Sequence, residues 1–120
     1  MWSTVPKFRY MDEYSKKYLM DVQTACEEVE SFFTGEKIFA KFQTDILRQR
    51  AVERNVEIMG EAINQLLKHN PTIVLENAKA IIGTRNRVIH AYDNVTPEFL
   101  WSLVINHIPK LHRDVEDLLK

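Results

Sequence analysis

The chain has 120 residues, of which 45% are hydrophobic and 28% are charged, and its formal net charge is −1 at pH 7. A chain of this length forms one domain around a single core, and its near-neutral charge excludes a global positive field that would attract nucleic acid. Any contact with nucleic acid must therefore depend on a local cluster of charges.

The single cysteine, Cys26, excludes an intrachain disulfide and a cysteine-based zinc site, and it fits a reducing compartment. The N-terminus lacks the basic start and apolar run of a secretory signal, and no stretch of about 18 successive apolar residues is present. We therefore expect a cytoplasmic protein that has no contact with a membrane.

Residues 1–11 have no clear period and contain Pro6, so we predict an N-terminal arm followed by one helical domain over residues 12–120. The first helix is predicted over residues 12–34, with Gly35 as its stop, because apolar residues recur there at three- and four-residue steps. We interpret the aromatic residues of this stripe as packing residues in preference to base-stacking platforms. The stripe comprises Tyr14, Tyr18, Val22, Ala25, Cys26, Val29, Phe32 and Phe33.

A short helical turn with Ile38, Phe39 and Phe42 is predicted next, followed by a second long helix over residues 44–69 that ends at Asn70 and Pro71. The third helix is predicted over residues 73–92 and bends at Gly83. Its inward positions are predicted to be Val74, Leu75, Ala78, Ile81, Ile82, Val88 and Ile89.

Thr96 and Pro97 predict the start of the last helix, because a hydroxyl caps free backbone N–H groups and proline suits the first helical turn. Pro109 is expected to kink this helix, which carries an apolar stripe from Leu100 to Leu119. Four one-sided helices must bury their stripes together, so the predicted fold is an all-α antiparallel four-helix bundle with a short extra helical turn.

The most informative segment places Arg85, Asn86, His90 and Tyr92 within about two turns of predicted helix. A guanidinium grips phosphate through paired charged hydrogen bonds, and an imidazole can move a proton near neutral pH. His90 is therefore the candidate acid or base, Arg85 the candidate phosphate ligand, and Asn86 a supporting residue that orients His90 or the phosphate. If the RNA's own 2′-hydroxyl is the nucleophile, no metal or cofactor is required and DNA is not cut.

The spacing leaves two geometries open. Asn86 and His90 lie within about 40° on a helix, whereas Arg85 and His90 diverge by about 140°. Either the long Arg85 side chain reaches around, helped by the bend at Gly83, or two copies of the helix face each other in a twofold homodimer whose clefts combine both chains.

The other polar residues are interpreted as structural. Arg48, Arg50 and Arg54 are predicted to form an ion-paired surface with neighbouring acids, and Glu57 and Glu61 to hold an arginine. Cys26 is expected to be buried and inert. The remaining histidines, which show no metal-ligand spacing, are His69, His107 and His112.

Residues 83–92, Gly-Thr-Arg-Asn-Arg-Val-Ile-His-Ala-Tyr, followed by Thr96, Pro97 and Trp101, resemble the HepT-like toxins of the HEPN superfamily. That family's signature is Arg, a polar residue, a short spacer, His, one residue and Tyr. Residues 54–62 also resemble the family's second-helix segment, so the resemblance covers residues 12–120. The segment before the motif, residues 74–77, lacks the tryptophan expected there, which bears on packing more than on chemistry.

The resemblance implies a HEPN-like bundle, a dimeric ribonuclease toxin of a prokaryotic toxin–antitoxin pair, and a small nucleotidyltransferase as antitoxin. It also implies silencing by transfer of AMP to the motif tyrosine, which is Tyr92 here; a half-buried packing residue is the alternative for that side chain. Some HEPN proteins do not cut RNA, so the alternative function is a non-catalytic nucleotide- or partner-binding subunit of a nucleotidyltransferase.

Overall fold

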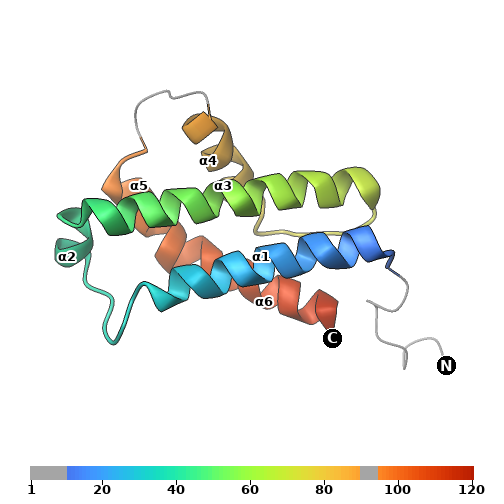
Figure 1. Cartoon of the computed structure of the whole chain (residues 1–120), viewed down its shortest axis with the longest axis horizontal. Helices are drawn as coiled ribbons and strands as arrows, with labels where there is room; N and C mark the ends of the chain where they lie inside the picture. Colours follow the sequence, from blue (N-terminus) through green and yellow to red (C-terminus); the bar gives the residue numbers. More distant parts are fainter. Residues whose placement is uncertain (1–10, 90–94) are drawn as a thin grey trace.

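The computed structural model describes residues 11–89 and 95–120, except for the side chains of residues 85–89. All regular structure in these two ranges is helical, which confirms the predicted all-α class (Figure 1). The elements are α1 (Glu13–Ser31), α2 (Phe39–Gln43), α3 (Ile46–His69), α4 (Lys79–Ile89), α5 (Pro97–Ser102), the π-helix η3 (Leu103–His107) and α6 (Ile108–Leu119).

Helices α1 and α3 are the two longest elements and form an antiparallel pair, with α6 also packed on α1 and α4 packed on α3 (Figure 1). Each of the two begins at an aspartate that accepts a backbone hydrogen bond. The Ser15 amide donates to Asp12 Oδ1 at 2.7 Å, and the Arg48 amide donates to Asp45 Oδ1 at 3.0 Å. These caps satisfy N–H groups that have no partner within the helix, so both helices start where the sequence supplies a short acidic side chain.

The core lies between α1, α3, α6 and the segment α5–η3. Its largest fully buried side chains are Phe42, Leu19, Met59, Ile63, Leu66, Ile81, Leu100, Leu103, Ile108, Leu111, Val22 and Val29. Except for Leu19, which the predicted stripe of the first helix omits, they come from the apolar positions that the sequence predicts, and this shared burial makes the bundle one unit.

The predicted short helical turn is α2, and it closes one end of the bundle. Phe42 is fully buried, and its ring centre lies 5.4 Å from that of Trp101. The Gln49 side-chain amide donates to the carbonyls of Phe42 at 2.9 Å and Gln43 at 3.0 Å, so a buried polar residue of α3 satisfies the end of α2.

The prediction of a helix from residue 73 was wrong for its first six positions, because α4 begins at Lys79. Val74 is 72% exposed instead of buried. The preceding segment is held by tertiary contacts: Leu75 is buried, and the Asn77 side-chain amide donates to Asp114 Oδ2 on α6 at 2.7 Å. A link of this kind to a residue far along the chain cannot be inferred from local periodicity.

Two further boundaries differ from the prediction. Helix α1 ends at Ser31, and Gly35, at φ 73°, lies in the following turn instead of at the helix end. Helix α4 is a single α-helical segment through Gly83, so no break in the helix occurs at the position predicted to bend.

The C-terminal helix starts as predicted, since the Phe99 amide donates to Thr96 Oγ1 at 3.1 Å and Pro97 occupies the first turn. The predicted irregularity near Pro109 is the π-helix η3, in which the Ile108 amide donates to the Leu103 carbonyl. Because Pro109 has no N–H to offer the Ile105 carbonyl, the α-helical pattern cannot continue through this turn.

No helix in the described part of the chain has both the length and the apolar character needed to cross a membrane.

Candidate functional site

The end of α4 carries the first half of the motif. Arg85 and Asn86 lie on continuous helical backbone that ends at Ile89. His90 and Tyr92 lie outside the described residues, so the structure places Arg85 and Asn86 together on one helix but does not bring all four motif residues into view. The geometry between Arg85 and His90 therefore stays a prediction.

The first half of α4 is fixed by burial against α3. Ile81 and Thr84 are both fully buried, and the Thr84 hydroxyl donates to the Ala80 carbonyl at 2.8 Å. This bond within the helix satisfies a polar group that would otherwise be costly to bury. The backbone at Arg85 thus follows directly after a well-packed residue, which gives the motif a rigid base.

The arginines of α3 form the ion-paired surface that the sequence predicts. Arg50 lies 3.0 Å from Glu53, and Arg54 lies 3.1 Å from Glu57. Arg48 lies 3.5 Å from Asp45, its nearest acid. Each guanidinium is partly or largely exposed, so these pairs contribute at most about 1 kcal/mol each and leave the arginines free to exchange partners.

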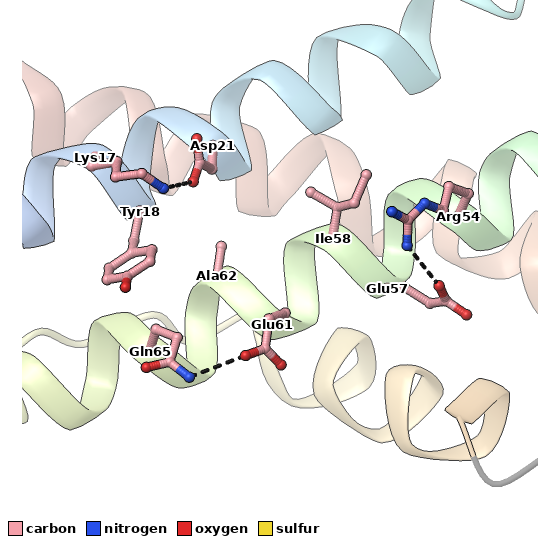
Figure 2. Close-up of a pocket in the computed structure, with 9 residues that line it drawn as sticks. All are labelled: Lys17, Tyr18, Asp21, Arg54, Glu57, Ile58, Glu61, Ala62 and Gln65. Atoms are coloured by element: carbon pink, nitrogen blue, oxygen red, sulfur yellow. Dashed lines mark hydrogen bonds and ion pairs between the residues drawn. The ribbon is translucent and has the colours of Figure 1, made fainter.

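A groove of about 500 Å³ runs between α1 and α3 on the side of α3 that bears the Arg54–Glu57 pair (Figure 2). Tyr18 and Gln65 lie toward one end of it and Arg54 toward the other, and the ribbon of α4 passes beside the part of α3 that carries Glu57 and Glu61 (Figure 2). The full lining is Lys17, Tyr18, Asp21, Arg54, Glu57, Ile58, Glu61, Ala62 and Gln65.

The charges of this groove are already engaged with one another. Lys17 Nζ lies 2.9 Å from Asp21, which raises the pKa of Lys17, and the Gln65 amide donates to Glu61 at 3.0 Å. Paired charges of this kind offer hydrogen bonds to a polar ligand but do not act as a strong phosphate clamp. The ion pair between Lys17 and Asp21 was not predicted from the sequence. The four-residue spacing of the two residues on a predicted helix was the signal that could have indicated it.

The other titratable candidates behave as structural groups. Cys26 is fully buried, and burial raises its pKa to about 12, which confirms the expectation of an inert thiol. His112 Nε2 lies 3.7 Å from Glu116 and 3.9 Å from Glu27. Within residues 11–89 and 95–120, no group of three or more His, Cys, Asp or Glu side chains is arranged to hold a metal ion.

Tyr14 does not lie where the stripe predicts. Its side chain is 62% exposed, and its ring stacks on His69 with centroids 5.1 Å apart and an interplanar angle of 4°. Tyr18 is half-buried and also stacks on His69, with centroids 5.9 Å apart. Ser15, its neighbour in the same turn of α1, is fully buried, so Tyr14 lies at the margin of the buried face, where a residue can keep the period of the stripe and remain in solvent.

The comparisons with a family model and with known proteins agree on one family. The ribonuclease HepT-like family model matches residues 22–118. A Thermococcus cleftensis protein named "Probable ribonuclease HepT" is 36% identical over 114 residues, covering 92% of this chain and all of that protein. A protein of Caldanaerobacter subterraneus, named as an RNase, is 30% identical over 110 residues, covering 88% of this chain and 94% of its own length.

A Methanocaldococcus jannaschii protein, also named as an RNase, is 28% identical over 109 residues, covering 88% of this chain and 87% of its own length. No solved structure matches the chain. The match to the family model runs from the middle of α1 to the last turn of α6 and includes α4 with Arg85. The chain therefore belongs to the ribonuclease HepT-like family, and its activity class is that of an endoribonuclease.

Proposed function

We propose that this chain is a metal-independent endoribonuclease toxin of a prokaryotic toxin–antitoxin pair. The observation that carries the proposal is that Arg85 and Asn86 lie on the helical backbone of α4, five and four residues before His90, in a chain of the ribonuclease HepT-like family. We infer that His90 joins these two residues in a phosphate-binding and proton-transferring set.

In the proposed reaction the ribose 2′-oxygen attacks the adjacent phosphorus and the bond from phosphorus to the 5′-oxygen breaks. His90 takes the 2′-hydroxyl proton or donates a proton to the leaving 5′-oxygen, while Arg85 stabilises the charge on the phosphate. The products are a 2′,3′-cyclic phosphate and a 5′-hydroxyl. Because the nucleophile belongs to the RNA, the reaction requires no metal ion.

The active form is proposed to be a homodimer. Arg85 and His90 are about 140° apart on an ideal helix, so a partner copy of α4 can supply the group that one chain directs away from the cleft. Activity should then rise with protein concentration in the range where sedimentation detects dimer formation. Full activity of a species that sedimentation shows to be monomeric would contradict this part of the proposal.

The decisive experiment is RNA cleavage by the purified protein in EDTA. Wild-type protein should convert several single-stranded RNAs to fragments with cyclic phosphate ends and leave DNA of the same sequence intact. His90→Ala should lower the rate by about 10²- to 10⁴-fold, because it removes a general acid or base. His107→Gln, on η3, serves as the matched histidine control and should keep nearly all of the activity.

Cleavage that is equal in wild type and His90→Ala, or absent from both across several RNAs, would contradict the enzymatic mechanism. The second of these results would favour the non-catalytic subunit of a nucleotidyltransferase. Growth arrest on expression, relieved by His90→Ala, would support the toxin role separately from the chemistry.

Silencing is proposed to occur through a nucleotidyltransferase antitoxin that attaches AMP to Tyr92. A nucleotide beside a phosphate-binding cleft would block RNA both by bulk and by negative charge. Intact-mass analysis after incubation with a candidate nucleotidyltransferase antitoxin and ATP should show AMP on wild type and none on Tyr92→Phe, which should keep its cleavage activity. AMP found on another residue would refute the assignment to Tyr92.

A further inference from the structure

Three aromatic rings form an exposed stack at the end of the groove farthest from Arg54. Tyr14 and Tyr18 lie one turn apart on α1, and both stack on His69 in the last turn of α3. The Tyr14 ring is nearly parallel to His69, at 4°, yet 62% of Tyr14 is exposed. We call this group, Tyr14, Tyr18 and His69, the ring stack.

The exposure of Tyr14 sets it apart from the other aromatic residues of the predicted apolar stripe. Phe32 and Phe33 are partly buried and pack against the hydrophobic core, as the sequence predicts. One face of the Tyr14 ring is held by His69, so its orientation is fixed while much of the side chain remains in water. A rigid, solvent-facing π surface is the element that stacks unpaired bases in proteins that bind single-stranded nucleic acid.

The charges around the ring stack are mixed. Lys17 Nζ lies 5.0 Å from the centre of the Tyr18 ring and is paired with Asp21, while Asp12 and Glu13 precede Tyr14. Such a setting does not provide a continuous track for phosphates, so it favours recognition through base faces with the phosphates turned to solvent.

The groove leads from the ring stack along α3 to Arg54, and the ribbon of α4 passes beside the Glu57 and Glu61 part of α3 (Figure 2). Gln65 and Arg54 are eleven residues apart on α3, which corresponds to about 17 Å along the helix axis, and His69 lies one turn beyond Gln65. At a stacked rise of about 3.4 Å per nucleotide, a strand of roughly six nucleotides spans this distance, and a more extended strand needs fewer. Figure 2 shows the opening over which such a strand would pass between α1 and α3.

We propose that the exposed ring of Tyr14 binds an unpaired nucleobase, and that the ring stack is an accessory subsite for the RNA strand whose cleavage is proposed above. The inference depends on that proposed function for its ligand. It adds a contact several nucleotides from the scissile phosphate, made by residues that lie outside the motif. The ligand chemistry is a base with a free face, whether in a strand or in a free nucleotide.

The test measures binding apart from cleavage. The probe is a fluorescein-labelled 12-nucleotide 2′-O-methyl adenosine RNA, which has no free 2′-hydroxyl and therefore cannot be cut by the proposed reaction. Tyr14→Ala should raise its Kd by about 5- to 100-fold, the range measured when a stacking residue is removed, whereas Tyr14→Phe should stay within about twofold of wild type. Met20→Ala is the matched control, because Met20 is 54% exposed on the same helix but outside the ring stack.

Three additional arms identify the ligand and exclude a purely structural effect. The same RNA in a duplex should lose the dependence on Tyr14, because its bases are covered. AMP at millimolar concentration reports the free-nucleotide source: a Tyr14-dependent affinity for AMP without one for the strand would assign the subsite to free nucleotides. Thermal unfolding of Tyr14→Ala and Met20→Ala should show similar midpoints, so that a change in Kd is not a change in folding.

Equal Kd values for wild type and Tyr14→Ala with both the strand and AMP would overturn the subsite. A loss of affinity that follows a fall in unfolding midpoint, and that Tyr14→Phe shares, would also overturn it. These binding results do not test the proposed cleavage mechanism. That mechanism is contradicted only if His90→Ala cleaves RNA at the wild-type rate or if neither protein cleaves RNA.

Discussion

Helices α3 and α4 differ in length and in how their residues are buried. Helix α3 has 24 residues, an aspartate cap and buried positions from Gln49 to Leu66, and its charged residues pair along its own surface. Helix α4 has 11 residues, and its described buried positions, Ile81 and Thr84, precede the motif. The described part of α4 is therefore held by few buried residues, whereas α3 is buried along most of its length and forms the base on which α4 packs.

The largest effect on RNA cleavage is expected to distinguish Arg85 of α4 from Arg54 of α3. Arg85→Ala should lower RNA cleavage by about 10²- to 10³-fold, because it removes a charged donor aimed at the developing phosphate charge. Arg54→Ala should change the rate by less than about threefold, because Arg54 is an exposed partner of Glu57 at 3.1 Å. Initial rates on one labelled RNA measure both.

Arg85→Lys tests whether the positive charge alone supports RNA cleavage. Lysine keeps the charge but loses the planar fork, so partial activity is expected between wild type and Arg85→Ala. Equal rates for Arg54→Ala and Arg85→Ala would remove the distinction between the two helices.

The second effect concerns stability. Met59→Ala should lower the free energy of unfolding by about 2–5 kcal/mol, because Met59 is fully buried in α3. Val74→Ala should change it by less than about 0.5 kcal/mol, because Val74 is 72% exposed before α4. Urea unfolding followed by circular dichroism measures both, and a large loss in Val74→Ala would mean that residues 73–78 are buried in solution.

A smaller loss is expected when the segment before α4 is released. Asn77→Ala removes the 2.7 Å hydrogen bond to Asp114 and leaves a partly buried carboxylate without that donor, so a loss of about 1–2 kcal/mol in unfolding free energy is expected. Asn77→Asp should be worse near neutral pH, because it places two carboxylates together. Wild-type stability of both variants would show that this contact does not hold the segment.

The smallest effect is a pH dependence at the start of α1. The Ser15 backbone N–H donates to Asp12 and lowers the pKa of that carboxyl below its ordinary value. Its contribution to stability is therefore present above the unfolded pKa of about 4 and is lost as pH falls through the lower folded pKa. Asp12→Asn keeps a neutral cap, so its stability difference from wild type should shrink between about pH 5 and pH 2; a difference that is constant over this range would contradict the assignment.

Much of the bundle could be predicted because its signals are local. The apolar period and the cap at Thr96 depend on neighbouring residues and were sufficient to place four of the helices, and the structure adds caps at Asp12 and Asp45. Residues 73–78 were misassigned because their shape depends on the contact between Asn77 and Asp114, 37 positions apart. Tyr14 was misassigned because periodicity does not show where the core ends.

The composition of the site, Arg85, Asn86, His90 and Tyr92, stays a prediction from the order of these residues. The structure shows that the backbone of Arg85 and Asn86 belongs to one helix, as expected. The approach of Arg85 to His90 depends on side-chain reach or on a second copy, and neither is encoded in helical spacing. The groove beside α3 was missed because it is formed by two helices whose contact is a tertiary property.

The wide turn at η3 has a consequence for how this chain tolerates insertions and deletions. A π-helical turn holds one residue more than an α-helical turn, so the extra residue between α5 and α6 sets their relative rotation. Deleting one residue from this turn would restore ordinary winding and rotate the Leu111 and Val115 side of α6 by about 100°, away from α1. The length of this short segment is thus more strictly constrained than its composition, and single-residue deletions here should be tolerated far less than substitutions.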